Sequence, residues 1–506
     1  MDRPESEAAP RAAGRLLRIM LVLLMMIGAA GPMAAQPADD ASIALAAAKD
    51  AFVRGETQNA LEELRKLRTD FPGSIAAIDS LDLSSEYSLA LGDVYRARYF
   101  LQKLLDEAPG SKAAFEASVA LAEYYYSARS WLAALEYYED AVEGFQEGVT
   151  GRRADLDLSL LRVSELSLYH DNNPVAARSY FMRIHPQTLP AAEIMLYREM
   201  RVRLLWSVLS AQSLSLRDAN ISCLRIDGDD LWVGTWNGGA ARYSVSSGSS
   251  DAFPSPAFTR SIEVADRRVW VGTAEGLSWY GKNTARWGSE PDFGGPTPRK
   301  VQALRATTAG LYAGTLGDGL FHLGADGWDP VSDGSLPGRF ITCLAEDAPR
   351  ARLLIGTMNI GLVVLDLKTG SMSTLAESLP DFTTDNITTI LTGADGRIWI
   401  GTYGEGLSVW SPDSNGLRHF TKASGEITDD WILASCETDR ALYFGGFGGG
   451  VSVLSKREDT WRHIGIAEGL ASLDVAAIAW RAPYVFFGTL RAGVCMYDEA
   501  ADGALP

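Results

Sequence analysis

The stretch Leu231-Trp-Val-Gly-Thr235 is the first of seven copies of one short pattern in a chain of 506 residues. Each copy has aliphatic or aromatic residues followed by Gly and, in six of the seven copies, by Thr. The later copies are marked by Gly272, Gly314, Gly356, Gly401, Gly445 and Gly488. The intervals between successive glycines are 38, 42, 42, 45, 44 and 43 residues. Such regular spacing indicates an internal structural repeat.

Each repeat contains four short segments with strand character. In the fifth copy, the strand-like residues 387–391 precede a turn at Asp395-Gly396, the Gly-Thr segment follows, and residues 407–410 form a third segment before a more polar fourth. Asp-Gly suits a tight turn because Gly adopts positive φ without steric cost. Four antiparallel strands in about 42 residues are typical of a propeller blade. Residues 214–506 are therefore predicted to form a seven-bladed all-β propeller.

The seventh repeat has only three clear strands before the end of the sequence. A closed ring needs a fourth strand for this blade, because an open sheet edge leaves backbone groups unpaired. We expect residues 213–217, immediately before the first repeat, to supply that strand.

The repeat resembles the two-component regulator propeller repeat, whose pattern runs Ile-x-x-Ile and then Gly-x-Leu-Trp-Val-Gly-Thr-x-x-Gly-Gly-Leu. The first and fifth copies match it best, at residues 232–239 and 399–407, whereas Gly446 replaces Thr in the sixth. In that family such propellers are often sensor modules ahead of a membrane span and a histidine kinase. This sequence has no kinase or receiver pattern, so the resemblance implies the fold and no signalling catalysis.

The first part of the chain has helical periodicity instead. Apolar residues recur at three- and four-residue steps, as in Ala60, Leu64 and Leu67, and a Pro-Gly-Ser ending at residues 72–74 returns 37 positions later at residues 109–111. Residues 40–213 are predicted to form an α-solenoid of helix pairs of the tetratricopeptide type. This part resembles the tetratricopeptide arms of bacterial envelope proteins. The predicted fold class is thus α + β multidomain.

Residues 1–36 have the pattern of a secretory signal. Arg11, Arg15 and Arg18 precede the apolar run 19–30, and small residues follow. Twelve residues of helix cover roughly 18 Å, less than the roughly 30 Å of a bilayer core. We expect cleavage and export to the periplasm, the cell envelope or the medium, with no membrane span afterwards. An uncleaved anchor is the alternative.

Composition excludes several functions. The 64 acidic and 46 basic residues give a net charge of −18, so nucleic acid is not an expected partner. Cys223, Cys343, Cys436 and Cys495 are predicted to be buried free thiols, because three of them lie inside apolar strand patterns and Cys223 and Cys343 fall at equivalent positions of non-neighbouring blades. No CxxC pair exists, so a zinc site or a redox motif has no support. The five histidines lack metal-ligand spacing, and no nucleophile elbow or phosphate loop is present. We predict no metal, no cofactor and no enzymatic activity.

The loops that follow each Gly-Thr pair are the candidate ligand site, because connections from the second to the third strand of every blade lie on one face of a propeller. Aromatic residues beside amides and carboxylates suit the recognition of a sugar or a peptide. The alternative is that they pack neighbouring blades and solvate the rim. The candidate residues are Trp236, Asn237, Glu275, Asp318, Asn359, Tyr403, Glu405, Phe447 and Arg491.

Tyrosines cluster around one helix pair of the arm, and they are the candidate contacts for a protein partner. They are Tyr124, Tyr125, Tyr137 and Tyr138. The alternative is that some of them belong to the core.

The function predicted from these features is that of a non-catalytic, exported binding or scaffold protein. The arm takes a protein partner, and the propeller face takes a glycan, a peptide or a second partner. Two alternatives stay open: a glycan-active lyase or hydrolase, and a sensing module that acts on a separate membrane kinase. A histidine with two convergent carboxylates at the channel mouth would favour the enzyme.

Overall fold

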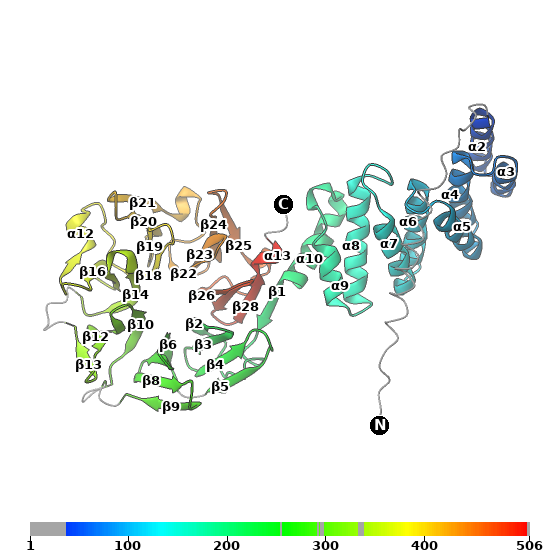
Figure 1. Ribbon diagram of the computed structural model, residues 1–506. Coiled ribbons are helices and arrows are strands. Elements are labelled where there is room, and N and C mark those ends of the chain that lie inside the picture. The colour runs from blue at the N-terminus through cyan, green and yellow to red at the C-terminus, as the bar shows by residue number, and fades with distance from the viewer. Residues whose placement is uncertain (1–36, 254–255, 291–292, 294–297, 332–337, 503–506) are drawn as a thin grey trace, which may run out of the picture. The chain divides into compact units, whose positions relative to one another are not determined.

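The structure, a computed structural model, describes residues 37–253, 256–290, 293, 298–331 and 338–502. The predicted signal segment lies outside the described residues. The chain divides into two compact units, one ending at Leu166 and the other beginning at Ser167 (Figure 1). No helix in the described ranges is long and apolar enough to cross a membrane.

The first unit consists of successive antiparallel helix pairs. Its helices are α2 (Pro37–Val53), α3 (Thr57–Asp70), α4 (Ile75–Ala90), α5 (Val94–Glu107), α6 (Lys112–Ser127), α7 (Trp131–Gly144) and α8 (Arg153–Tyr169), whose last residues belong to the second unit. The hydroxyls of Ser74 and Ser111 accept the backbone N–H of the third helical residue of α4 and α6, both at 3.1 Å. The fully buried Ala60, Ala97 and Ala134 recur 37 residues apart. The helix-pair fold predicted from these repeats is confirmed.

The second unit begins with helices and continues into seven four-stranded sheets. The helices are α9 (Pro174–Phe181), the short turns η1 (Pro186–Thr188) and η2 (Ala191–Glu193), and α10 (Ile194–Leu205). Blades one to three are β2 (Ile221–Asp227), β3 (Asp230–Thr235), β4 (Ala240–Ser244) and β5 (Ser250–Phe253); β6 (Thr259–Ala265), β7 (Arg268–Thr273), β8 (Gly276–Gly281) and β9 (Arg286–Ser289); and β10 (Val301–Thr307), β11 (Gly310–Thr315), β12 (Leu320–Leu323) and β13 (Trp328–Pro330).

The remaining blades repeat this order. They are β14 (Ile341–Asp347), β15 (Arg352–Thr357), β16 (Leu362–Asp366) and β17 (Met372–Thr374); β18 (Ile387–Thr392), β19 (Ile398–Thr402), β20 (Leu407–Ser411) and β21 (Gly416–Phe420); β22 (Ile432–Glu437), β23 (Ala441–Gly446), β24 (Val451–Ser455) and β25 (Trp461–Ile464); and β26 (Val475–Arg481), β27 (Tyr484–Thr489) and β28 (Gly493–Asp498) with β1 (Trp206–Leu209). The connections hold η3 (Ala348–Arg350), α12 (Leu375–Ser378), η4 (Lys422–Ser424) and η5 (Ile466–Glu468).

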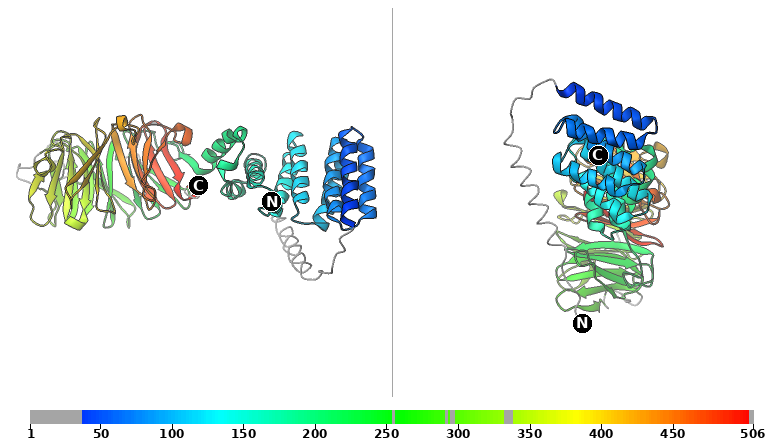
Figure 2. Two further views of the ribbon diagram at one scale, coloured as in Figure 1. Left: turned by 90° about the horizontal axis from the view of Figure 1, so that it is seen from above. Right: turned by 90° about the vertical axis from the view of Figure 1, so that its right-hand side faces the viewer.

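The sheets form a closed ring. The first strand of each blade contacts the first strand of the next, and β26 of the seventh blade contacts β2 of the first. Figure 1 shows these seven first strands around the centre, and the left panel of Figure 2 shows the ring edge-on. Apolar side chains fill the space between blades, as where Trp399 of blade five packs on Phe444 of blade six, with ring centroids 5.2 Å apart. The predicted seven-bladed propeller is confirmed.

The strand that closes the ring is not the predicted one. Residues 206–209 (β1), expected to be helical, pair antiparallel with β28, and Trp206 stacks on Tyr497 with centroids 4.6 Å apart. The predicted closing segment, residues 213–217, forms turns, and Leu214 and Leu216 pack into the core of blades seven and one. The prediction was wrong because the apolar run of α10 continues without a break into β1.

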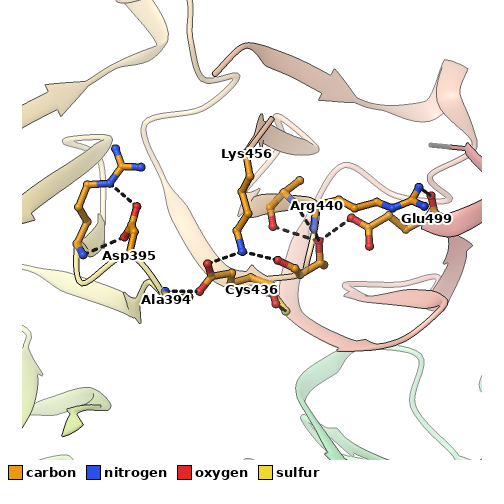
Figure 3. Close-up of polar contacts among 10 residues, drawn as sticks. Ala394, Asp395, Cys436, Arg440, Lys456 and Glu499 are labelled. Atoms are coloured by element: carbon orange, nitrogen blue, oxygen red, sulfur yellow. Dashed lines mark hydrogen bonds and ion pairs between the residues drawn. The ribbon is translucent and has the colours of Figure 1, made fainter. Parts of the chain in front are cut away.

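The C-terminal turn α13 (Glu499–Asp502) fastens the last blade to its neighbours. The Glu499 carboxylate accepts a hydrogen bond from Thr438 at 2.6 Å (Figure 3). It accepts a second one from Tyr443 at 3.0 Å, and both donors belong to blade six. Arg201 of α10 donates through Nε to Asp502 at 2.9 Å. These buried, charge-assisted contacts explain why α10 belongs to the same compact unit as the ring.

Candidate binding face of the propeller

The threonine of the Gly-Thr pair shapes the loop that follows it. In blade five, Thr402 Oγ1 donates to the carbonyl of Gly406 at 2.8 Å and accepts the N–H of Glu405 at 3.0 Å. The same carbonyl bond occurs in every blade except the sixth. There, a Cβ on Gly446 would lie 2.7 Å from Cβ of Asp429, so the site has no room for Thr. Short-range side-chain bonds of this kind hold a tight loop without secondary structure.

All nine predicted ligand residues lie in these loops, at one face of the ring. We call this face, with the connections between blades, the loop face. The side chains are exposed, including Trp236 at 43%, Tyr403 at 50% and Phe447 at 42%, and also Asn237, Glu275, Asp318, Asn359, Glu405 and Arg491. The loops bring them to one edge of successive blades rather than into one pocket.

The residues just before the first strand of each blade lie next to the loops that follow the Gly-Thr pairs. The residue after each Gly-Thr or Gly-Gly pair donates its backbone N–H to the residue just before the first strand of its blade, as Trp236 does to Asn220 at 3.0 Å and Phe447 to Trp431 at 3.0 Å. The other five pairs are Ala274–Phe258, Leu316–Lys300, Met358–Phe340, Tyr403–Asn386 and Leu490–Asp474. The first member is apolar or aromatic in every blade.

Exposed apolar side chains of the ring gather on the loop face. Among described ring residues, all the large exposed apolar side chains except Val208 of β1 lie in connections on this face. They are Trp236, Phe258, Phe340, Met358, Ile360, Tyr403, Phe447 and Ile466. Exposed apolar side chains that gather on one face of a domain mark a candidate site of interaction.

The aromatic residues are pre-arranged by contacts with one another. Trp431 stacks on Tyr403 at 4.3 Å between centroids and on Phe447 at 5.4 Å. Across the face, the Arg260 guanidinium lies 3.8 Å from the ring centre of Trp236. Rings held in this way lose little conformational entropy when they contact a ligand.

Sequence reasoning missed Phe258, Phe340 and Trp431. They occupy the position immediately before the first strand of their blades, so the repeat could have located them had that position been tracked. The connections before these strands vary in length, which hides the shared position.

The acidic residues of the loop face are free to act on a ligand. Glu275, Asp318 and Glu405 are exposed, and none forms an ion pair with a described residue. The loop of Glu405 also holds the exposed Tyr403. The face thus combines apolar surface with unpaired carboxylates, and Arg339 and Arg491 are exposed there as well.

The histidines of the ring lie away from the channel mouth. His322, His419 and His463 are on third or fourth strands, and His419 contacts the hydroxyl of Ser408 at 2.9 Å. In the described part of the chain no group of three His, Cys, Asp or Glu side chains is placed to hold a metal. All four cysteines are free thiols, and burial raises the pKa of Cys223, Cys343 and Cys436 to about 12. Thiols with such a pKa are protonated near neutral pH and are poor nucleophiles.

Two of the four predicted partner-binding tyrosines of the arm are core residues. Tyr138 is fully buried and donates its hydroxyl to Glu123 at 2.5 Å, and Tyr137 is 9% exposed. Tyr125 stacks on Tyr137 at 5.5 Å between centroids, and Tyr124 meets Tyr125 edge-on at 5.6 Å. Tyr137 and Tyr138 are buried because α6 and α7 pack on each other along this side, whereas Tyr124 and Tyr125 remain half-buried.

The arm has a cavity of about 780 Å³ on the side where α6 and α8 meet. Phe115, Val119 and Leu158 line it, with Tyr138 among its walls. It lies wholly within the first unit and offers apolar contacts beside the exposed Glu123.

Comparison with known proteins agrees with the repeat. Residues 381–404, which span the first two strands of blade five, match the two component regulator propeller family. No curated protein matches the chain.

Solved structures are similar to part of the chain at low identity. The extracellular domain of the hybrid two component system BT3049 from B. thetaiotaomicron is 17% identical, with a TM-score of 0.49, over 58% of this chain and 42% of that one. The extracellular domain of the one component system BT4673 from the same organism is 18% identical, with a TM-score of 0.47, over 58% and 40%. YCF48 bound to D1 peptide is 13% identical, with a TM-score of 0.46, over 58% and 96%. The chain thus spans about two fifths of the length of the first two.

Proposed function

We propose that this protein is a non-catalytic binding module whose loop face takes an apolar, basic segment of another protein. The observation that carries the proposal is the gathering of exposed apolar side chains of the ring on one face, beside unpaired carboxylates. Apolar contact supplies affinity, and the carboxylates select a segment with Lys or Arg near its apolar residues.

A protein segment fits this face better than a glycan. Sugar recognition needs directional hydrogen bonds beside each aromatic ring. Here Phe258, Phe340, Met358 and Ile360 expose only carbon or sulfur surface. Such side chains contribute to protein interfaces, where Met and aromatic residues are enriched.

Selection of displayed random peptides on the full chain tests the proposal. We expect the selected peptides to combine aromatic or aliphatic residues with Lys or Arg. Binding should weaken at least tenfold in Trp236→Ala and Tyr403→Ala, while the melting temperature stays nearly unchanged. Val208→Ala, an exposed apolar position on the outermost strand, is the matched control and should bind as the parent does.

Two results would contradict this function. Selected peptides that bind the two loop-face variants as tightly as the parent would place the site elsewhere. A large loss of stability in Trp236→Ala or Tyr403→Ala would assign these side chains to packing. Binding of a glycan that displaces the peptides would favour the glycan alternative instead.

We further propose that the chain is exported and acts in the cell envelope, as residues 1–36 indicate. The match of residues 381–404 to a regulator propeller repeat supports a sensing role, in which segment binding is passed to a membrane partner. The arm cavity beside Phe115 and Val119 would take that second protein. Cleavage after export is tested by sequencing the N-terminus of protein recovered from the envelope.

A further inference from the structure

The central channel of the propeller holds a cavity separate from the loop face. Its volume is about 310 Å³, and its walls are the later halves of first strands, near the turns to the second strands. Because successive strands of a blade are antiparallel, these turns lie on the face opposite to the loops. None of the residues of the proposed segment site lines this cavity.

One side of the cavity is charged. Arg225, Glu263 and Arg305 occupy the same level of blades one, two and three, since each pairs with the residue two positions before the repeated Gly. Arg225 pairs with the buried Glu263. Two guanidinium groups and one carboxylate leave one positive charge at this level.

Arg305 is the unmatched group. It forms no hydrogen bond or ion pair with a described residue, and its Nε is buried without an acceptor. Burial lowers the pKa of this arginine, and Glu263 acts in the opposite direction. A buried guanidinium nitrogen without an acceptor costs free energy, so such atoms are normally paired, although the rest of this side chain is only half-buried.

The nearby carboxylates are already engaged. Glu346 accepts the N–H and the hydroxyl of Thr308, both at 2.8 Å. Glu437 accepts the N–H of Ala394 at 2.9 Å and pairs with Lys456 at 2.6 Å (Figure 3). None of the described residues supplies an acceptor for Arg305 Nε, so water or a ligand must supply it.

The walls of blades four, five and seven are largely apolar, whereas blade six adds Ser435, Cys436 and Glu437. At the level of the arginines, blades four, five and seven carry Ala345, Leu391 and Ala479. Ile390 and Ile478 also line the wall. Water and inorganic anions gain nothing from such a wall, whereas an apolar group gains about 25 cal/mol per Å² buried.

We propose that the channel binds a small monocarboxylate with an apolar body, its carboxylate on Arg305 and Arg225 and its body against the walls of blades four, five and seven. The carboxylate accepts from the planar guanidinium groups, which suit it better than an ammonium does.

Titration of the full chain with benzoate, by calorimetry and thermal shift, tests this site. Benzoate should bind and raise the melting temperature. Arg305→Met, which keeps the length and removes the charge, should weaken binding at least tenfold, and Arg305→Lys should retain part of it. Arg339→Met changes an exposed arginine of the loop face and should bind benzoate like the parent.

Benzamide and inorganic phosphate separate the two parts of the proposal. Benzamide has the body without the charge, and phosphate has charge without the body, so both should bind at least tenfold more weakly than benzoate. The proposal is overturned if benzoate fails to bind, or if Arg305→Met and Arg305→Lys bind it like the parent. Equal binding of benzamide or phosphate would also overturn it. The peptides selected on the loop face are also tested on Arg305→Met. If they still bind this variant, the loop-face function stands, whether or not benzoate binds in the channel.

Discussion

The glycine of each Gly-Thr pair lies where the second strand of one blade passes the first strand of the next. A Cβ on Gly401 would lie 2.6 Å from Cγ2 of Thr389 in its own blade and 2.8 Å from Cγ2 of Ile432 in blade six. Real Cβ atoms do not approach other atoms so closely, and both neighbours are branched at Cβ, which leaves them few rotamers. The repeated Gly is thus required because the packed blades leave no room for a Cβ atom, and the backbone freedom of glycine is not the reason.

Gly401→Ala should therefore destabilise the propeller by about 1–3 kcal/mol, the usual cost of overpacking a core. Chemical denaturation followed by tryptophan fluorescence measures the change. The matched control is Gly416→Ala in the same blade, because this glycine is exposed and its nearest neighbour would be Ser414 Oγ at 3.2 Å. Equal stability of the two variants would show that the blades can move apart to admit the methyl group.

At the scale of elements, the closing strand β1 decides whether blade seven is complete. Trp206 stacks on Tyr497 and on Phe487, with ring centroids 4.6 and 5.7 Å away.

Trp206→Ala should lower the free energy of unfolding by about 2–4 kcal/mol, because it removes a large aromatic side chain from a packed sheet. The measurement is the midpoint of thermal unfolding. Val208→Ala in the same strand changes a side chain that is 46% exposed and should change the midpoint little. Similar losses in both variants would mean that strand pairing, and not the indole, holds β1.

The elements differ in how far the sequence could predict them. The seven blades could be predicted because one local pattern, strand-Gly-Thr, repeats at nearly constant intervals. β1 could not, because residues 204–209 are apolar except for Ser207 and carry no turn signal, and the state of the last four residues depends on pairing with β28 at the far end of the chain. Tertiary context overrides local propensity in such a short strand.

In the candidate site, too, the periodic features could be predicted from the sequence, and the features that depend on tertiary contacts could not. The loops after Gly-Thr were predictable by period, so Trp236, Tyr403 and Phe447 were predicted to lie on one face, where the structure places them. The stacking of Trp431 between Tyr403 and Phe447, and the missing partner of Arg305, depend on which side chains meet across blades. The spacing of the repeats gives no information on these side-chain contacts between blades.

At the scale of the whole molecule, the division into two compact units lets each respond to pH on its own. Asp82 of α4 is largely buried in the first unit, and this burial raises the pKa of its carboxyl from 3.8 to about 7. The carboxylates that face it strengthen the effect, Glu116 on α6 and Asp79 and Glu86 on α4, while Lys112 on α6 opposes it.

The sign of the pH dependence follows from the raised pKa. Below about pH 4, Asp82 is protonated in both the folded and the unfolded chain, so it has no destabilising effect. Between about pH 4 and 7 the unfolded chain releases this proton and the folded unit keeps it, so the free energy of unfolding falls as pH rises. The full loss, reached above about pH 7, is at most about 4 kcal/mol.

Asp82→Asn should therefore raise the melting temperature of the first unit at about pH 8 and remove most of its dependence on pH. Differential scanning calorimetry of the full chain measures this, because two compact units are expected to give two transitions. Asp50→Asn, at an exposed position of α2, is the control and should leave both transitions in place. If the Asp82→Asn change moved both transitions together, the two units would unfold as one cooperative block, and the separation of arm and propeller on which their distinct binding roles rest would be lost.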